Sequence, residues 1–164
     1  MPNWCEGNIR FCGTKKNIKN FIENEIVYVL PHGGNPIEVK PTIEENKYSM
    51  VLYPPEGEMR DSFYFRNTMR NFIFSGTIEV GWPDAEEDEE IVVILDDFNS
   101  AWAFRSDGWA DHAKKYNIDI RMVGFEQGMQ FSQIMTIMRD GSVTDNVEHY
   151  ADWDWDCPFP NMGG

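Results

Sequence analysis

The chain has 164 residues with a formal net charge of -14, and 41% of the residues are hydrophobic and 14% aromatic. This composition excludes an intrinsically disordered chain, and no apolar run approaches the ~20 residues that a membrane-spanning helix needs. The negative charge also argues against direct binding to nucleic-acid phosphates, which requires a basic surface.

The charge is unevenly distributed along the chain. Residues 1–78 contain nine Lys/Arg and nine Asp/Glu, so they are neutral overall. Residues 79–164 contain five Lys/Arg and nineteen Asp/Glu and therefore carry the whole excess of -14. A basic protein partner, a cation or simple solubility would each account for such a charge.

The first part of the chain predicts a strand followed by a helix. Apolar and polar residues alternate over 3–12, which indicates a strand, and we expect it to be central in a sheet. Thr14 can cap a helix at 15–28, whose apolar face would consist of Ile18, Phe21, Ile22 and Ile26. Residues 31–46 have the composition of a loop.

The middle of the chain predicts further strands at 47–53, 76–82 and 91–98. Segment 60–75 is ambiguous, because "SFYFR" fits a short strand and "NTMRNFIF" fits a short helix or a turn. An acidic loop at 83–90 joins the second and third of these strands. A second helix is then predicted at 102–116, with one face formed by Trp102, Trp109, Ala113 and Tyr116.

The last part of the chain predicts a strand at 118–125 and a hairpin. Asp140-Gly141 is a strong turn signal between strands at 130–139 and 142–150. The element order contains β-α-β-β-α-β, so we expect one domain over 1–164 in the α+β class. Its expected form is ferredoxin-like: an antiparallel sheet with two helices on one face and an added C-terminal hairpin.

The opening stretch, "MPNWCEGNIRFCG", resembles the start of the YubB family of phage- and plasmid-borne proteins with a ferredoxin-like domain. Two further stretches, "FNSAWAFRSDGW" and "GFEQGMQFSQ", are similar to a strand-to-helix junction and a hairpin of that family. The resemblance implies a mobile-element origin and a ferredoxin-like fold. It implies no reaction and no cofactor.

Aromatic and cysteine residues near the N-terminus are expected to be structural. We expect Trp4, Cys5, Trp102 and Trp109 to form a shared cluster, with Trp4 buried between the first strand and the second helix. Three cysteines without a secretory signal predict free thiols in a cytoplasmic protein. Cys5 and Cys12 should point to opposite faces of one strand.

Two acidic segments are the candidate partner-binding sites. The loop at 83–90 is either a solvated loop or a docking surface for a basic partner. The acidic-aromatic tail at 151–164 is either a strand packed on the sheet or an exposed strip for a partner, and period two would place both its tryptophans on one face. The candidate residues are Glu86, Glu87, Glu89, Glu90, Asp152, Trp153, Asp154, Trp155 and Asp156.

The sequence pattern predicts no catalytic site. His32, His112 and His149 lie in unrelated settings, and no nucleophile or phosphate-loop motif accompanies them. We therefore expect a protein that is not an enzyme and has no cofactor, metal, direct nucleic-acid or membrane partner.

The leading functional hypothesis is a phage or mobile-element accessory protein that binds a basic host protein in the host cytoplasm. By mimicking nucleic acid, its acidic surface would inhibit a defence system such as CRISPR or restriction. One alternative is an acidic soluble protein whose partner and oligomeric state the sequence leaves open. Another is a metal-binding protein or enzyme that uses Asp96, Asp97 and Glu126.

Overall fold

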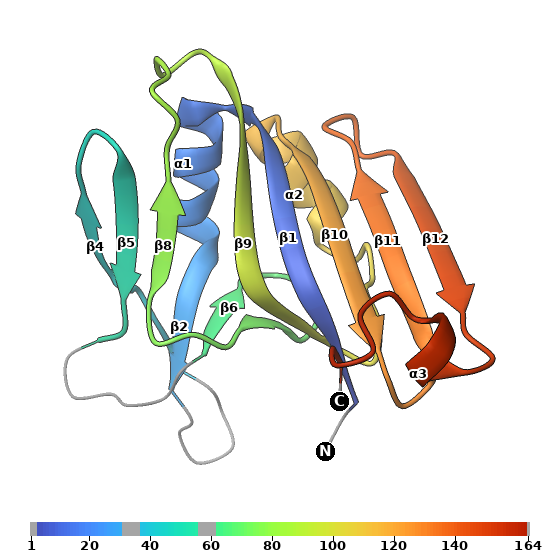
Figure 1. The fold of residues 1–164 in the computed structure, drawn as a ribbon. Coiled ribbons are helices and arrows are strands. Elements are labelled where there is room, and N and C mark those ends of the chain that lie inside the picture. The colour runs from blue at the N-terminus through green and yellow to red at the C-terminus, as the bar shows by residue number, and fades with distance from the viewer. Residues whose placement is uncertain (1–2, 31–36, 56–61, 164) are drawn as a thin grey trace.

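The structure is a computed structural model and describes residues 3–30, 37–55 and 62–163. Within these residues the chain is an α+β protein with a nine-stranded antiparallel sheet, a three-stranded sheet and three short helices (Figure 1). The large sheet has the order β12-β11-β10-β1-β9-β7-β6-β2-β3, and the small one the order β4-β5-β8.

The strands of the large sheet are β1 (Trp4–Thr14), β2 (Ile26–Leu30), β3 (Ile37–Val39), β6 (Phe63–Phe65), β7 (Asn71–Ile73), β9 (Glu90–Ala101), β10 (Asp119–Glu126), β11 (Phe131–Ile137) and β12 (Val143–His149). The strands of the small sheet are β4 (Thr42–Glu45), β5 (Ser49–Tyr53) and β8 (Ile78–Gly81). The helices are α1 (Lys15–Glu25), α2 (Trp109–Tyr116) and α3 (Trp153–Asp156). None of the helices in the described residues has the length and apolarity of a membrane-spanning helix.

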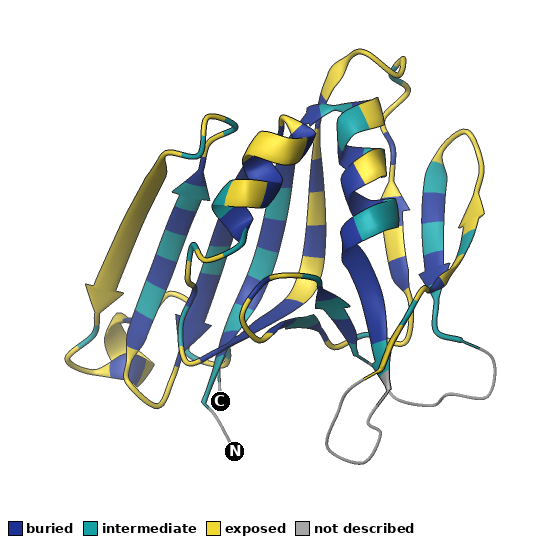
Figure 2. Cartoon of the chain, turned by 180° about the vertical axis from the view of Figure 1, so that it is seen from behind, coloured by how far each residue is buried: buried dark blue, intermediate teal, exposed yellow. Residues whose placement is uncertain are grey.

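Strand β1 lies inside the large sheet, as predicted, and pairs with β10 on one side and β9 on the other. Its residues alternate in burial, so the sheet has two different faces. Helices α1 and α2 cover one face (Figure 2), which we call the helix-covered face; β1 contributes Cys5, Ile9 and Phe11 to it. The opposite, helix-free face carries Glu6 and Arg10 of β1.

Helix α1 is capped as predicted, because the Thr14 hydroxyl oxygen accepts a hydrogen bond from the backbone N–H of Asn17 at 3.2 Å. The helix ends at Glu25 and is shorter than predicted. The β-branched residues Ile26 and Val27 continue directly as β2 and pair with β6.

Helix α2 also starts later than predicted. Strand β9 runs to Ala101, and the helix begins only at Trp109, after Gly108 in a left-handed conformation (φ 78°). A side chain at Gly108 would collide with the carbonyl oxygen of Asn67, 1.9 Å from an ideal Cβ, so only glycine fits there. Trp102 therefore lies outside the helix and is exposed.

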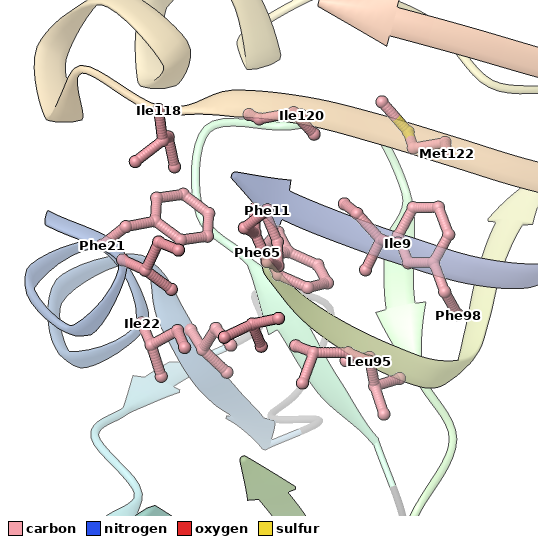
Figure 3. Packing of buried hydrophobic residues seen from close by; sticks show 14 of the residues in the cluster. Ile9, Phe11, Phe21, Ile22, Phe65, Leu95, Phe98, Ile118, Ile120 and Met122 are labelled. Carbon is pink, nitrogen blue, oxygen red and sulfur yellow. The ribbon is translucent and has the colours of Figure 1, made fainter. Parts of the chain in front are cut away.

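The main core lies between the helix-covered face and the two helices, and Figure 3 shows the rings of Phe11, Phe21, Phe65 and Phe98 within it. The ring of Phe21 is 4.9 Å from that of Phe11, and the ring of Phe65 is 4.9 Å from that of Trp109. The core continues into the small sheet through buried side chains of β5 and β8. This face therefore carries most of the buried apolar area that stabilises the fold.

The prediction that Trp4 is buried beneath the second helix is wrong. Alternation along β1 places Trp4 on the helix-free face, where it is half-buried and packs edge-on against Phe72 and Phe74, with ring centroids 5.8 and 5.0 Å away. Of the expected cluster, Cys5 and Trp109 lie in the core. Cys12 lies on the opposite face of β1 from Cys5, and all three cysteines are free, as predicted.

Several short strands were not predicted. The expected loop at 31–46 contains β3 and β4 within its described part, and the ambiguous segment at 60–75 forms the hairpin β6–β7. Strands of three or four residues are too short to show a period. The longer predicted strands are confirmed, as is the Asp140-Gly141 turn between β11 and β12.

Candidate partner-binding surface

The acidic loop is tied to the start of α1. The backbone N–H groups of Lys15 and Lys16 donate to the carbonyl oxygens of Glu89 and Glu87, at 3.0 and 2.9 Å. These bonds satisfy donors that a helix start leaves open, and they hold negative charge beside the positive end of the helix dipole. The carboxylates of Glu86, Glu87 and Glu89 remain exposed.

Among the four candidate glutamates of the loop, Glu90 is the one whose carboxylate forms an ion pair within the described residues. Arg139 donates to both of its carboxylate oxygens, at 2.9 and 3.1 Å, and also to Asp119 at 2.9 Å. Hydrogen bonds from Arg139 hold the pKa values of Glu90 and Asp119 below their ordinary values. Glu90 thus links the start of β9 to the β11–β12 hairpin.

The acidic-aromatic tail forms the short helix α3 and not a strand. The Asp152 carboxylate caps it by accepting from the backbone N–H of Trp155 at 3.2 Å. The expectation that both tryptophans share a face is therefore wrong: Trp153 is 3% exposed and Trp155 is 86% exposed. Trp153 packs with Phe125 of β10 and with Cys157, so the tail does pin itself to the sheet.

A β-bulge in β9 supplies a second group of acids. Gly7 pairs with Phe98 and Ile9 pairs with Leu95, so Asp96 and Asp97 together lie opposite the single residue between Gly7 and Ile9. Alternation of burial breaks at the same point, because both aspartates are exposed. Asp97 has a φ of 56°, which Asp tolerates better than most residues. The bulge thus delivers two adjacent carboxylates to the surface.

These aspartates border a hollow of about 360 Å³ on the helix-free face, which we call the acidic hollow. Its C-terminal wall is Met162, and the next residue, Gly163, donates its backbone N–H to the Glu6 carboxylate at 3.1 Å. The tail therefore runs from α3 to the hollow along one face of the sheet (Figure 1). The residues that line it are Glu6, Gly7, Asn8, Phe74, Asp96, Asp97, Asn99 and Met162.

Asn99 is the most unusual residue of the hollow. Its side chain is 5% exposed, and its Nδ2 donates to the carbonyl oxygen of Asp97 at 2.7 Å. Its Oδ1 is buried without a hydrogen-bond partner in the described chain, which costs ~1–3 kcal/mol. Among the described residues, no cation pairs with Glu6, Asp96 or Asp97. The hollow therefore offers acceptors that lack donors.

An aromatic wall closes one side of the hollow. Phe74 is 40% exposed, and its ring stacks on that of Phe72 at 5.7 Å. Trp4 packs edge-on against the same Phe74 ring. Trp4 thus supports the exposed Phe74 ring and in this way contributes to the candidate site.

The described residues offer little support for a metal site or for catalysis. In the described parts of the chain, no three His, Cys, Asp or Glu side chains converge as a metal ion requires. Glu126 does not line the acidic hollow: it is fully buried, and its carboxylate accepts from the backbone N–H groups of Gly128 and Met129 at 2.8 and 2.6 Å. Burial, and then the nearby Glu126 carboxylate, raise the pKa of the Cys5 thiol, so Cys5 is a poor nucleophile.

Of the three histidines, His112 lies in a buried structural setting, His149 is exposed, and His32 lies outside the described residues. His112 is buried, with Nε2 at 2.7 Å from the carbonyl oxygen of Arg66 and Nδ1 at 4.0 Å from the Glu25 carboxylate. Burial would raise the pKa of Glu25, but hydrogen bonds from Lys115 and from the Tyr116 hydroxyl outweigh it and lower that pKa. This cluster joins α1 to α2.

His149 lies on the exposed edge strand β12, with its ring 5.8 Å from that of Phe131. The ring contacts of His112 are with Phe21, Trp109 and Tyr116, and within the described residues none joins it to His149. The two rings therefore do not form a shared site.

Comparisons of this chain with protein-family models, curated proteins and solved structures found no match. Of the residues around the hollow, the sequence drew attention only to Asp96 and Asp97. Glu6, Phe74 and Asn99 were missed. The available signal was a pair of acids at the end of an alternating strand, a pattern that fits a bulge.

Proposed function

We propose that this chain is a non-enzymatic accessory protein of a phage or plasmid that binds a basic host protein in the host cytoplasm. The observation that carries the proposal is the acidic hollow, where carboxylates without a cation partner among the described residues and a buried acceptor lie beside an exposed aromatic ring. Carboxylates would steer a basic partner to this face, and aromatic side chains would supply the buried area that affinity needs.

The tail supports the same surface. Trp155 is 86% exposed and lies beside Asp154, whose carboxylate is also exposed. A tryptophan left in water is costly without a use and is enriched at interaction hot spots. Because the tail leads from α3 to the hollow, both belong to one continuous binding face in this proposal.

The mobile-element origin rests on the sequence resemblance and on a proposed relation of folds. Strands β10, β1 and β9 are neighbours, and β2 follows beyond the β6–β7 hairpin. This is the order of a ferredoxin-like sheet with one hairpin inserted before its edge strand. We propose that the chain has this ferredoxin-like topology.

Mimicry of nucleic acid is the narrower form of the proposal, and we place it second. A mimic needs a dense stripe of acids, because DNA carries a charge every ~1.7 Å. On the helix-free face, Arg10 lies directly opposite Arg121, between the acidic loop and the acidic hollow. This arginine pair interrupts the stripe, so local contacts by the hollow and tail are favoured. Inhibition of a CRISPR or restriction system would be a consequence of binding there.

The test is affinity capture from host lysate at low and high salt, followed by identification and purification of the retained protein. The dissociation constant of the purified partner is then measured for wild type, Trp155→Ala and a double variant with Asp96→Asn and Asp97→Asn. We expect weaker binding by both variants and a loss of affinity as salt rises. Unchanged affinity and salt dependence in both variants would contradict the proposal.

A further inference from the structure

We propose that the acidic hollow is a socket for one arginine side chain of a protein partner. The inference rests on the proposed function for the nature of the partner, but the chemistry of the ligand follows from the hollow itself. Three properties point to a guanidinium: an acceptor without a donor, carboxylates that are spread apart, and an aromatic wall.

The unpartnered acceptor requires an N–H donor. Rotating the Asn99 side-chain amide by half a turn would exchange its Oδ1 and Nδ2. This would break the hydrogen bond that Nδ2 donates to the carbonyl oxygen of Asp97 at 2.7 Å. Asn99 lines the hollow, and its Oδ1 therefore stays a buried acceptor to which no described residue donates. A buried acceptor of this kind is satisfied when a ligand brings a donor.

The carboxylates specify a cation that is wider than a metal ion. Glu6, Asp96 and Asp97 border the hollow, yet they do not converge on one point as metal ligands do. A guanidinium carries five N–H donors in a planar fork and can reach several separate acceptors at once. The ammonium of lysine is a compact, strongly hydrated point charge and fits this layout less well.

The walls suit the rest of an arginine side chain. The exposed ring of Phe74 offers a face on which a guanidinium plane stacks, and Trp4 and Phe72 hold that ring in place. Met162 adds an apolar surface for the methylene stem. A volume of about 360 Å³ is at the small end of ligand sites, which suits one side chain and not a strand or helix.

The experiment is an NMR titration of the full chain with the blocked peptide acetyl-Gly-Arg-Gly-amide. The controls are the same peptide with lysine, and with citrulline, which keeps the shape of arginine but has no charge. We expect the arginine peptide to shift the Asn99 side-chain amide and the backbone amides of Asp96 and Asp97. The lysine peptide should bind several-fold more weakly, and the citrulline peptide should cause no saturable shift.

Two variants of equal charge sharpen the test. The double variant with Asp96→Asn and Asp97→Asn should lower the affinity for the arginine peptide about tenfold. Asn is well tolerated at the left-handed backbone of position 97. Glu86→Gln with Glu87→Gln removes the same charge from the acidic loop and should leave the affinity unchanged. Phe74→Leu should weaken binding about two- to fivefold.

Several outcomes would overturn the socket. These are equal binding of the citrulline peptide, equal loss in both double variants, or saturable shifts of the same amides by CaCl₂ or MgCl₂ but not by the arginine peptide. The proposed function fails separately. If the peptide binds as expected but no host protein is retained, the socket stands without the function. If the purified partner binds through the tail and the peptide shifts nothing, the function stands without the socket.

Discussion

The two faces of the large sheet are built from the same strands but have opposite chemistry. On the helix-covered face, Phe11, Phe98 and Trp109 are fully buried, and the rings of Phe98 and Trp109 pack against each other. On the helix-free face, the carboxylates of the acidic hollow have no cation partner among the described residues, and Phe74 is exposed to solvent. Because side chains alternate between the two faces of a strand, one set stabilises the fold and the other set is available for binding.

The largest expected effect is on the helix-covered face. Trp109→Ala should reduce the free energy of unfolding by ~3–5 kcal/mol, because a fully buried ring is replaced by a cavity. Urea unfolding followed by far-UV circular dichroism measures it. A loss under ~1 kcal/mol would mean that the core does not depend on this ring.

Trp4→Ala is the matching change on the helix-free face. We expect a loss of ~1–2 kcal/mol, because Trp4 is half-buried and its contacts are edge-on aromatic pairs with Phe72 and Phe74. The same variant should lower the affinity for the arginine peptide, because the Phe74 ring loses the contact that supports it. If Trp4→Ala were as destabilising as Trp109→Ala, the distinction between the two faces would fail.

The Arg139 cluster should make a pH-dependent contribution. The pKa values of Glu90 and Asp119 are lower in the folded chain, so their stabilisation is present above the unfolded values of ~4 and is lost as pH falls through the lowered ones. Arg139→Gln should therefore cost ~1 kcal/mol at pH 7, a figure already reduced for solvent screening, and almost nothing once both carboxyls are protonated.

The control for that variant is Arg105→Gln, which breaks the exposed pair with Asp107. It should change stability little at either pH. Denaturant midpoints at pH 7 and at acidic pH provide the comparison, and a constant difference between wild type and Arg139→Gln would refute the ion-pair explanation.

The smallest expected effect is at the acidic hollow. Replacing Asp96 and Asp97 by asparagine should change the free energy of unfolding by less than ~0.5 kcal/mol, or raise it slightly, because neighbouring like charges are removed at the surface. Thermal unfolding would show this. A large loss of stability would mean that the two carboxylates hold the bulge together and are not free for a ligand.

Much of the fold could be predicted from local pattern. The sequence predicts the alternation of side chains in β1, the apolar face of α1 and the Asp140-Gly141 turn. The same period places Trp4 with the polar residues of β1, which is why the prediction that Trp4 is buried in the core was wrong. Among the three-residue strands, β6 lies where the sequence left a short strand open, whereas β3 and β7 were not predicted, because so few residues show no period.

The candidate site was harder to predict than the fold. Glu6 and Asp96 are far apart in sequence and become neighbours only through the register of β1 and β9 and its bulge. The alternating acids and tryptophans of the tail looked like a strand, but the Asp152 carboxylate stabilises a helical turn instead. Register and capping are properties of the folded chain that composition does not reveal.

The central place of β1 has a consequence for synthesis. Strand β1 is synthesised before its partners, residues 90–101 and 119–125, because these lie further along the chain. Its apolar side therefore stays exposed until those residues have been made. Folds with such distant pairings form slowly and expose surfaces on which chaperones act. We expect β1 to become protected from hydrogen exchange only after residues 119–126 have been synthesised.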